Sequence, residues 1–187
     1  QCCLVGSEMC IRDRSYRKIR NTFRYILGNL KDNFSPQNFK SIKVKELPEL
    51  EQVILHKLYF LSLEIKKSLK DYNFHKLQKE LLNFCTLDLS SFYFDIRKDT
   101  LYCDDVSSQK RKSCVTSLNI ILECLLKWYA PVLSFTTEEI TNLSNKNKKL
   151  SIHEETFSDL PENWQNETLY KKWEKLLSFR QEVNIAI

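Results

Sequence analysis

The sequence predicts an all-α fold, a bundle of amphipathic helices. It contains only two glycines and four prolines among 187 residues, too few for a sheet with many tight turns or for a glycine-rich phosphate loop. Apolar residues recur at steps of three and four residues over several long segments, which is the period of a helix with one buried face. With 42% hydrophobic residues, the chain has enough apolar side chains to form a core.

The first helix is expected over residues 15–30, where the helical period begins. Residues 1–14 hold three of the seven cysteines and show no such period. Residues 9–14 resemble the translation of a sequencing adapter. We therefore interpret residues 1–14 as a non-native leader, with a short leader peptide as the alternative. Residues 32–46 are polar and rich in lysine and are expected to form a connection.

Two long helices are expected next. Residues 47–71 carry an apolar stripe, and Pro48 suits the first turn of a helix. After a short break, a third helix is expected from Phe74 towards Ile96, and residues 99–108 are expected to form a polar connection. Long neighbouring helices joined by short turns are typical of an antiparallel bundle.

A fourth helix is expected over residues 110–129, and it is apolar around most of its circumference. Such a helix belongs in the middle of a bundle. Pro131 is expected to end or kink this helix. Thr136 and Glu139 have the spacing of a capping box, which predicts a short helix that runs through Leu143.

The remaining segments are a loop, an extended stretch and a last helix. Residues 145–149 are expected to be a solvated loop, and residues 150–157 to be extended. The last helix is expected to begin near Glu167, because apolar residues return at helical spacing from Leu169 onwards.

The sequence contains no recognisable catalytic or metal-binding motif. A Gly-x-Ser-x-Gly elbow, a Walker loop, a His-Glu-x-x-His helix and a Cys-x-x-Cys pair are all absent. We therefore expect no catalytic, cofactor-binding or metal-binding residues in the chain. No apolar run reaches the length of a membrane-spanning helix, and cysteines within apolar helical patterns suit a reducing, cytoplasmic setting.

Basic residues on the first helix are the first candidate for RNA binding. At about 100° per residue, a separate stripe beside the apolar face is formed by Arg17, Arg20, Asn21 and Arg24. Three neighbouring guanidinium groups repel one another, and RNA phosphates would relieve that repulsion through bidentate contacts. Salt bridges to acidic residues on neighbouring elements are an equally weighted alternative.

A second candidate lies over residues 92–99, where three aromatic residues are followed by two basic ones. In this stretch Tyr93, Arg97 and Lys98 are the candidate RNA-binding residues, since exposed aromatic rings beside basic groups stack on unpaired bases. The alternative is that this segment belongs to the core, with Phe92 and Ile96 buried and only the three candidates outside.

Four segments, in this order, resemble isoleucyl-tRNA synthetases. Residues 16–30 resemble the helix that follows the nucleotide-binding fold of these class I enzymes, and residues 47–52 the opening of their anticodon domain. Residues 83–103 resemble the most recognisable stretch of that domain, and residues 125–140 match again. The stretch from Asp95 to Cys103 favours the isoleucyl branch. Thr141 departs from the family, which usually has an aromatic residue there.

The resemblance implies a domain organisation for residues 15–187. Residues 15–46 would be a connecting helix and linker from a catalytic domain outside this chain. Residues 47–144 would be a helical bundle of the class I anticodon-binding type, and residues 145–187 a loop and the start of a C-terminal helical extension.

The resemblance also implies an activity and partners for the whole enzyme. The parent would ligate isoleucine to tRNA(Ile) with ATP and magnesium, and many members carry zinc in a C-terminal module. The implied partners are tRNA(Ile) and the catalytic domain of the same chain, with no membrane and a monomeric state. A valyl-type synthetase and a non-enzymatic helical interaction module are the alternatives.

Overall fold

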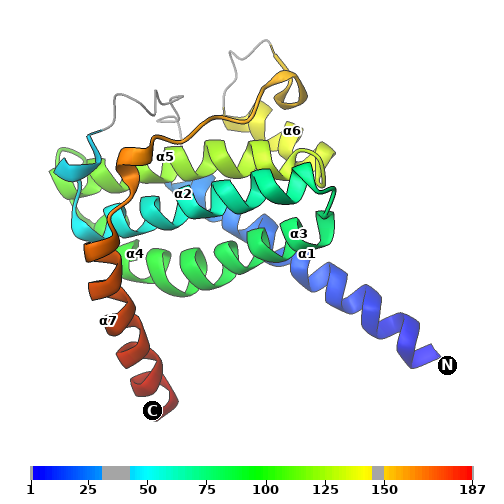
Figure 1. Ribbon diagram of the computed structural model, residues 1–187, viewed down its shortest axis with the longest axis horizontal. Helices are drawn as coiled ribbons and strands as arrows, with labels where there is room; N and C mark the ends of the chain where they lie inside the picture. Colours follow the sequence, from blue (N-terminus) through cyan, green and yellow to red (C-terminus); the bar gives the residue numbers. More distant parts are fainter. Residues whose placement is uncertain (1, 31–42, 145–149, 187) are drawn as a thin grey trace.

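The structure is a computed structural model that describes residues 2–30, 43–144 and 150–186. Across these ranges the regular elements are helical and no strand occurs, which confirms the predicted all-α fold. The longest helices are α1 (Cys2–Leu30), α2 (Glu49–Lys70) and α5 (Gln109–Tyr129) (Figure 1). The backbone is already helical from Cys2, where no helix was expected. The interpretation of residues 1–14 as a non-native leader stays a prediction.

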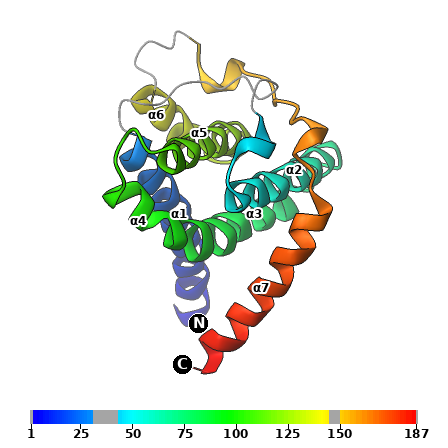
Figure 2. The same ribbon diagram turned by 90° about the vertical axis from the view of Figure 1, so that its left-hand side faces the viewer.

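Helix α5 lies in the middle of the bundle, as its apolar circumference predicted. It contacts α1, α2, α4 and α6 (Figure 2). Its buried residues include Leu118, Ile121, Leu125 and Trp128, and the ring of Phe23 on α1 meets that of Tyr129 edge-on at 5.9 Å. Helix α1 therefore contributes to the same hydrophobic core as the helices that follow it in the chain.

The third predicted helix is one continuous helical rod made of three parts. It consists of α3 (Phe74–Asn83), a π-helix η4 (Phe84–Tyr93) and α4 (Phe94–Cys103). Asn73 caps its start, because the side-chain oxygen accepts a hydrogen bond from the backbone N–H of Lys76 at 3.0 Å. The rod is longer than predicted, so residues 99–103, expected in a polar connection, are helical.

The π-helix changes which residues of this rod face the core. In an α-helix, a step of four residues overshoots one turn by about 40°, so residues four apart drift away from the core. The wider π-helical turn removes this drift. One row of buried residues therefore recurs at every fourth position along the whole rod, and other buried residues flank it. The row consists of Leu77, Leu81, Cys85, Leu89, Tyr93, Arg97 and Leu101.

The C-terminal part contains short helices and one long helix. Helix α6 spans Ser134–Ser144 and begins before the predicted capping box; the Thr136 hydroxyl instead pairs with the hydroxyl of Tyr16 at 3.1 Å. The 3₁₀ helices are η3 (Val44–Glu46), η5 (Ile152–Glu154) and η6 (Glu162–Trp164). The prediction that residues 150–157 are extended throughout is thus wrong, because Ser151 and Glu154 form a capping box there.

Helix α7 (Glu167–Ala186) begins where the last helix was predicted. It lies against α2 and then runs beyond the bundle, on the same side as the N-terminal end of α1 (Figures 1 and 2). The Trp173 indole donates a hydrogen bond to Glu49 at 3.3 Å and meets the ring of Phe92 edge-on. The predicted connection over residues 32–42 and the predicted loop at 145–149 lie outside the described residues.

Candidate RNA-binding surface

The basic residues of α1 form an exposed face opposite the core. The four predicted RNA-binding residues of this helix are all exposed, namely Arg17, Arg20, Asn21 and Arg24. The buried residues Ile19, Phe23 and Ile26 hold the other side of α1 in the bundle. The tertiary packing therefore fixes the direction in which the arginines point, away from the apolar side chains.

No ion pair neutralises these arginines within the described residues. Five basic side chains and no acidic one occur between Arg14 and Arg24. The described residues supply no carboxylate within salt-bridge distance of Arg17, Arg20 or Arg24, whereas several lysines of α2 and α3 are paired. Among the described residues, the salt-bridged alternative for this face therefore finds no support, and an external anion such as an RNA phosphate would relieve the repulsion among the guanidinium groups.

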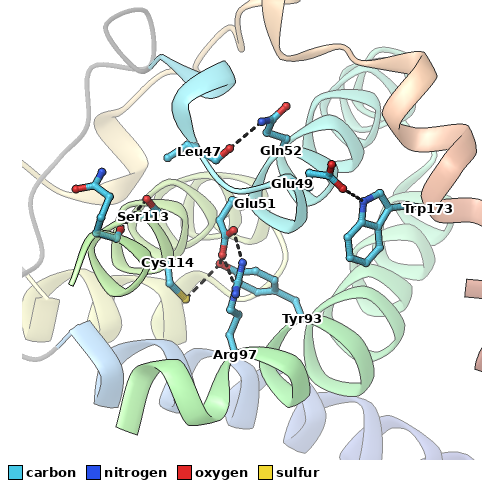
Figure 3. Close-up of polar contacts among 10 residues, drawn as sticks. Leu47, Glu49, Glu51, Gln52, Tyr93, Arg97, Ser113, Cys114 and Trp173 are labelled. Atoms are coloured by element: carbon cyan, nitrogen blue, oxygen red, sulfur yellow. Dashed lines mark hydrogen bonds and ion pairs between the residues drawn. The ribbon is translucent and has the colours of Figure 1, made fainter. Parts of the chain in front are cut away.

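Two predicted RNA-binding residues, Tyr93 and Arg97, lie in the core, so their predicted exposure is wrong. Arg97 forms a bidentate pair with the buried carboxylate of Glu51, with Nε–Oε1 and Nη2–Oε2 distances of 2.6 and 2.5 Å (Figure 3). The Tyr93 hydroxyl donates to the same carboxylate at 3.3 Å and lies 3.4 Å from the Cys114 sulfur. The π-helix is the cause, because it turns these two residues inward and leaves Ile96 exposed.

This buried network also shifts the pKa of its members. Burial raises the pKa of the Tyr93 hydroxyl well above its usual value, with the nearby Cys114 and Glu51 adding to the effect. Burial alone would lower the pKa of Arg97, but the hydrogen bonds and charge of Glu51 raise it overall. Arg97 therefore stays charged and paired, and its role in this structure is to hold α4 against the N-terminal turn of α2.

Lys98 is the one member of the second candidate group that reaches the surface. Its Nζ lies 3.0 Å from a carboxylate oxygen of Asp95, and this hydrogen bond raises the pKa of Lys98. Asp95 also accepts a hydrogen bond from Arg180 of α7 at 3.2 Å. Asp95 thus lies between two cations on the exposed side of α4.

A surface pocket between α1 and α4 brings Asn21 and Lys98 together. It has a volume of about 370 Å³, and its lining comes from Asn21, Tyr25, Ser90, Phe94, Asp95, Lys98 and Tyr102. The rings of Tyr25 and Phe94 stack at 4.2 Å with an interplanar angle of 20°. The two candidate surfaces predicted from the sequence therefore meet, although only Lys98 represents the second.

Tyr25 and Tyr102 were not predicted as site residues. They come from helices that are distant in the sequence, and each looks like an ordinary member of an amphipathic pattern. The sequence signal for Tyr102 is weak, namely its position in a segment rich in charged residues. Their convergence on one pocket depends on how α1 packs against η4 and α4.

A second hollow has the opposite electrostatic character. It lies among α2, α3, η4 and α7 and has a volume of about 390 Å³. Four carboxylates line it, those of Glu64, Glu80, Asp88 and Glu167, while Lys57 is its only lysine. A surface with this charge balance repels phosphate groups, so the α1 face is the better candidate for RNA.

Clusters of metal-ligating side chains and membrane-spanning helices were sought among the described residues. Within the described ranges, no group of three or more His, Cys, Asp or Glu side chains is placed to hold a metal. None of the helices in these ranges combines the length and the apolar content that a bilayer crossing requires.

Comparison with known proteins identifies the family. A family model described as the anticodon-binding domain of tRNA ligase matches residues 51–187. The isoleucine–tRNA ligase of Pelagibacter ubique (strain HTCC1062) is 60% identical over 173 residues, 92% of this chain and 19% of that protein. The isoleucine–tRNA ligases of Agrobacterium fabrum (strain C58) and Mesorhizobium japonicum are 41% and 39% identical, each over 92% of this chain and 17% of the relative.

The chain thus spans less than one fifth of the length of these curated relatives. The family match covers α2 through α7, the helices that carry one wall of the α1–α4 pocket and the buried Glu51–Arg97 pair. The family match agrees with the helical architecture and with the resemblance of residues 83–103 and 125–140. On this evidence the chain belongs to the family of anticodon-binding domains of tRNA ligases.

Proposed function

We propose that this chain binds the anticodon arm of tRNA(Ile) as part of an isoleucine–tRNA ligase. The exposed arginines of α1 contact backbone phosphates, and the neighbouring pocket faces the same RNA. The observation that carries this proposal is the basic face of α1, with five cationic side chains, no acidic one and no ion pair to Arg17, Arg20 or Arg24 from the described residues. The identity of 60% to an isoleucine–tRNA ligase supports isoleucine over valine.

The parent protein proposed here joins isoleucine to tRNA with ATP and magnesium. Those steps belong to a catalytic domain outside the 187 residues, and zinc belongs to a further C-terminal module. This chain would position the tRNA so that its acceptor end reaches the catalytic domain. The proposed parent protein is a monomer in the cytoplasm.

The test is a binding series over a range of salt concentrations. The chain is titrated with the tRNA(Ile) transcript and with a transcript of the same fold but a different anticodon. Arg20→Ala is expected to weaken binding to both RNAs alike, and to make the slope of log K against log salt shallower by about 0.7–0.9, the value for one phosphate contact. Phosphate contacts carry no sequence information, which is why both RNAs are affected.

Lys67→Ala is the matched control, because Lys67 is an exposed cation on α2 rather than on α1. It changes the net charge by the same amount and is expected to leave the salt slope unchanged. If Arg20→Ala altered only the preference between the two RNAs, the phosphate role would be wrong. If the folded wild-type chain preferred neither RNA and its affinity did not fall with salt, the whole proposal would be wrong.

A further inference from the structure

The hollow among α2, α3, η4 and α7 carries more negative charge than the lysines around it balance. Two of its four carboxylates, those of Glu64 and Asp88, pair with lysines. Among the described residues, no cation lies within ion-pair distance of the other two, Glu80 on α3 and Glu167 at the start of α7. Unpaired carboxylates from two helices attract a cation into the hollow, but charge alone does not specify its kind.

A buried histidine in the wall of the hollow supplies a second, independent signal. His56 lines the hollow and is 3% exposed, and its Nδ1 accepts a hydrogen bond from the backbone N–H of Asn166 at 3.0 Å. Burial lowers the pKa of His56, so the ring is neutral at neutral pH and its proton lies on Nε2. The described residues offer no acceptor to this N–H. A ligand that fits the hollow therefore combines a positive charge with a hydrogen-bond acceptor.

Aromatic rings surround this histidine and favour a planar cation. The ring of Tyr170 stacks on His56 at 4.7 Å, and the ring of Phe60, which is 39% exposed, lies 4.8 Å from it. Both rings line the hollow. A guanidinium group is planar, stacks on aromatic rings and donates two parallel hydrogen bonds to a carboxylate, whereas an ammonium group is a compact point charge.

Other cations fit these features less well. A linear polyamine has ammonium groups but no acceptor for the N–H of His56. A metal ion binds a nitrogen with a free electron pair, which the protonated Nε2 lacks. A free arginine carries an α-carboxylate, which Glu80 and Glu167 repel. An arginine within a polypeptide has the same guanidinium group beside neutral backbone carbonyls, which accept hydrogen bonds.

We propose that the hollow among α2, α3, η4 and α7 binds an arginine side chain of a partner polypeptide. Glu80 and Glu167 balance the charge of the guanidinium group, Phe60 stacks on it, and a neighbouring backbone carbonyl accepts the Nε2–H of His56. The volume of about 390 Å³ is within the range of roughly 300–1,000 Å³ typical of ligand pockets. No residue of α1 lines this hollow, so it is expected to fill independently of the RNA-binding face.

The experiment is an NMR titration of the full chain with a capped pentapeptide that has arginine between two pairs of glycines. The same peptide with citrulline, the neutral isostere of arginine, tests the charge. Glu80→Gln and Glu167→Gln test the two carboxylates. Glu174→Gln is the matched control, because it removes the same charge from an exposed position of α7 that does not line the hollow. Far-UV circular dichroism melting verifies that each variant folds.

Hydrogen bonds to charged groups predict that the citrulline peptide binds about tenfold more weakly than the arginine peptide. Glu80→Gln and Glu167→Gln should each weaken binding of the arginine peptide by about twofold to fivefold, the range of partly exposed ion pairs. Glu174→Gln should have no effect. With isotope-labelled histidine, the Nε2 resonance of His56 should shift when the peptide binds, and those of the exposed His75 and His153 should not.

Three results would overturn the proposal. If the folded chain bound the citrulline peptide as tightly as the arginine peptide, or bound neither, the hollow would not be an arginine site. If Glu80→Gln and Glu167→Gln had no larger effect than Glu174→Gln, or the His56 resonance stayed in place, the peptide would bind elsewhere. If spermidine bound as tightly as the peptide and shifted the same resonances, the ligand would be a polyamine. None of these results bears on RNA binding by α1.

Discussion

Replacing Arg97 by methionine is predicted to destabilise the fold while leaving the salt dependence of RNA binding unchanged. The Glu51 carboxylate is fully buried, and the Arg97 side chain is 7% exposed. Removing the guanidinium leaves a buried carboxylate to which, among the described side chains, only the Tyr93 hydroxyl donates a hydrogen bond. Breaking a buried ion pair in this way costs about 3–5 kcal/mol of stability.

The magnitude translates into a large shift in the melting temperature. For a chain of this length, each kcal/mol changes Tm by about 2–4 °C, so Arg97→Met should lower Tm by about 6–20 °C. Urea denaturation followed by circular dichroism gives the free energy of unfolding directly. The double variant Glu51→Leu/Arg97→Met should recover most of the loss, because it removes both buried charges.

Lys98→Met is the matched control for Arg97→Met. Lys98 pairs with Asp95 on the surface, where an ion pair contributes about 0–1 kcal/mol, so Lys98→Met should be nearly neutral for stability. If Arg97→Met cost less than about 1 kcal/mol and made the salt slope of RNA binding shallower, the buried pair would not be the role of Arg97. A direct phosphate contact would then explain the data better.

Three further predictions follow from other parts of the structure. Burial lowers the pKa of His56 from its usual 6.5. The contribution of neutral His56 to the free energy of unfolding should therefore be complete above about pH 6.5 and decrease as the pH falls towards the lowered pKa. Urea titrations of His56→Gln should show a smaller decrease over this pH range. A variant that lacks the three N-terminal cysteines should react with a thiol reagent at the exposed Cys103 in the native state. Cys85 should react only after unfolding, because burial raises the pKa of its thiol to about 12. Trp173→Ala should expose α7 to limited proteolysis well before global unfolding, since the indole contacts both Glu49 and Phe92.

The regular helices were predictable because each obeys one period. In α2 and α5 the buried residues follow a spacing of three and four, and the predicted bounds agree with the observed ones to within one or two residues. The start of α7 at Glu167 was also predicted. In these segments the local sequence pattern and the tertiary packing favour burial of the same residues.

The central rod was mispredicted because its period changes. Over α3, η4 and α4 one row of buried residues recurs at every fourth position, from Leu77 to Leu101. No α-helix sustains this spacing, and the sequence carries no separate signal for a π-helix. An α-helical phase places Ile96 inside and Arg97 outside, whereas the structure has the reverse. Predicting the burial of Arg97 also requires its partner Glu51, which lies on another helix, 46 residues away in the sequence.

The π-helix also connects the stability of the core with the candidate site. By turning Arg97 inward to Glu51, it turns Asp95, Lys98 and Tyr102 outward towards α1, so the buried ion pair and the pocket lie on opposite sides of the same short helix. Loosening the pair should let α4 move relative to α1 and weaken any contact that needs both pocket walls. The arginine face needs only α1. Below the melting temperature of the variant, Arg97→Met should therefore weaken binding of the anticodon-arm hairpin of tRNA(Ile) more than binding of a blunt duplex with the same stem. A bundle in which α4 cannot move relative to α1 does not predict this difference.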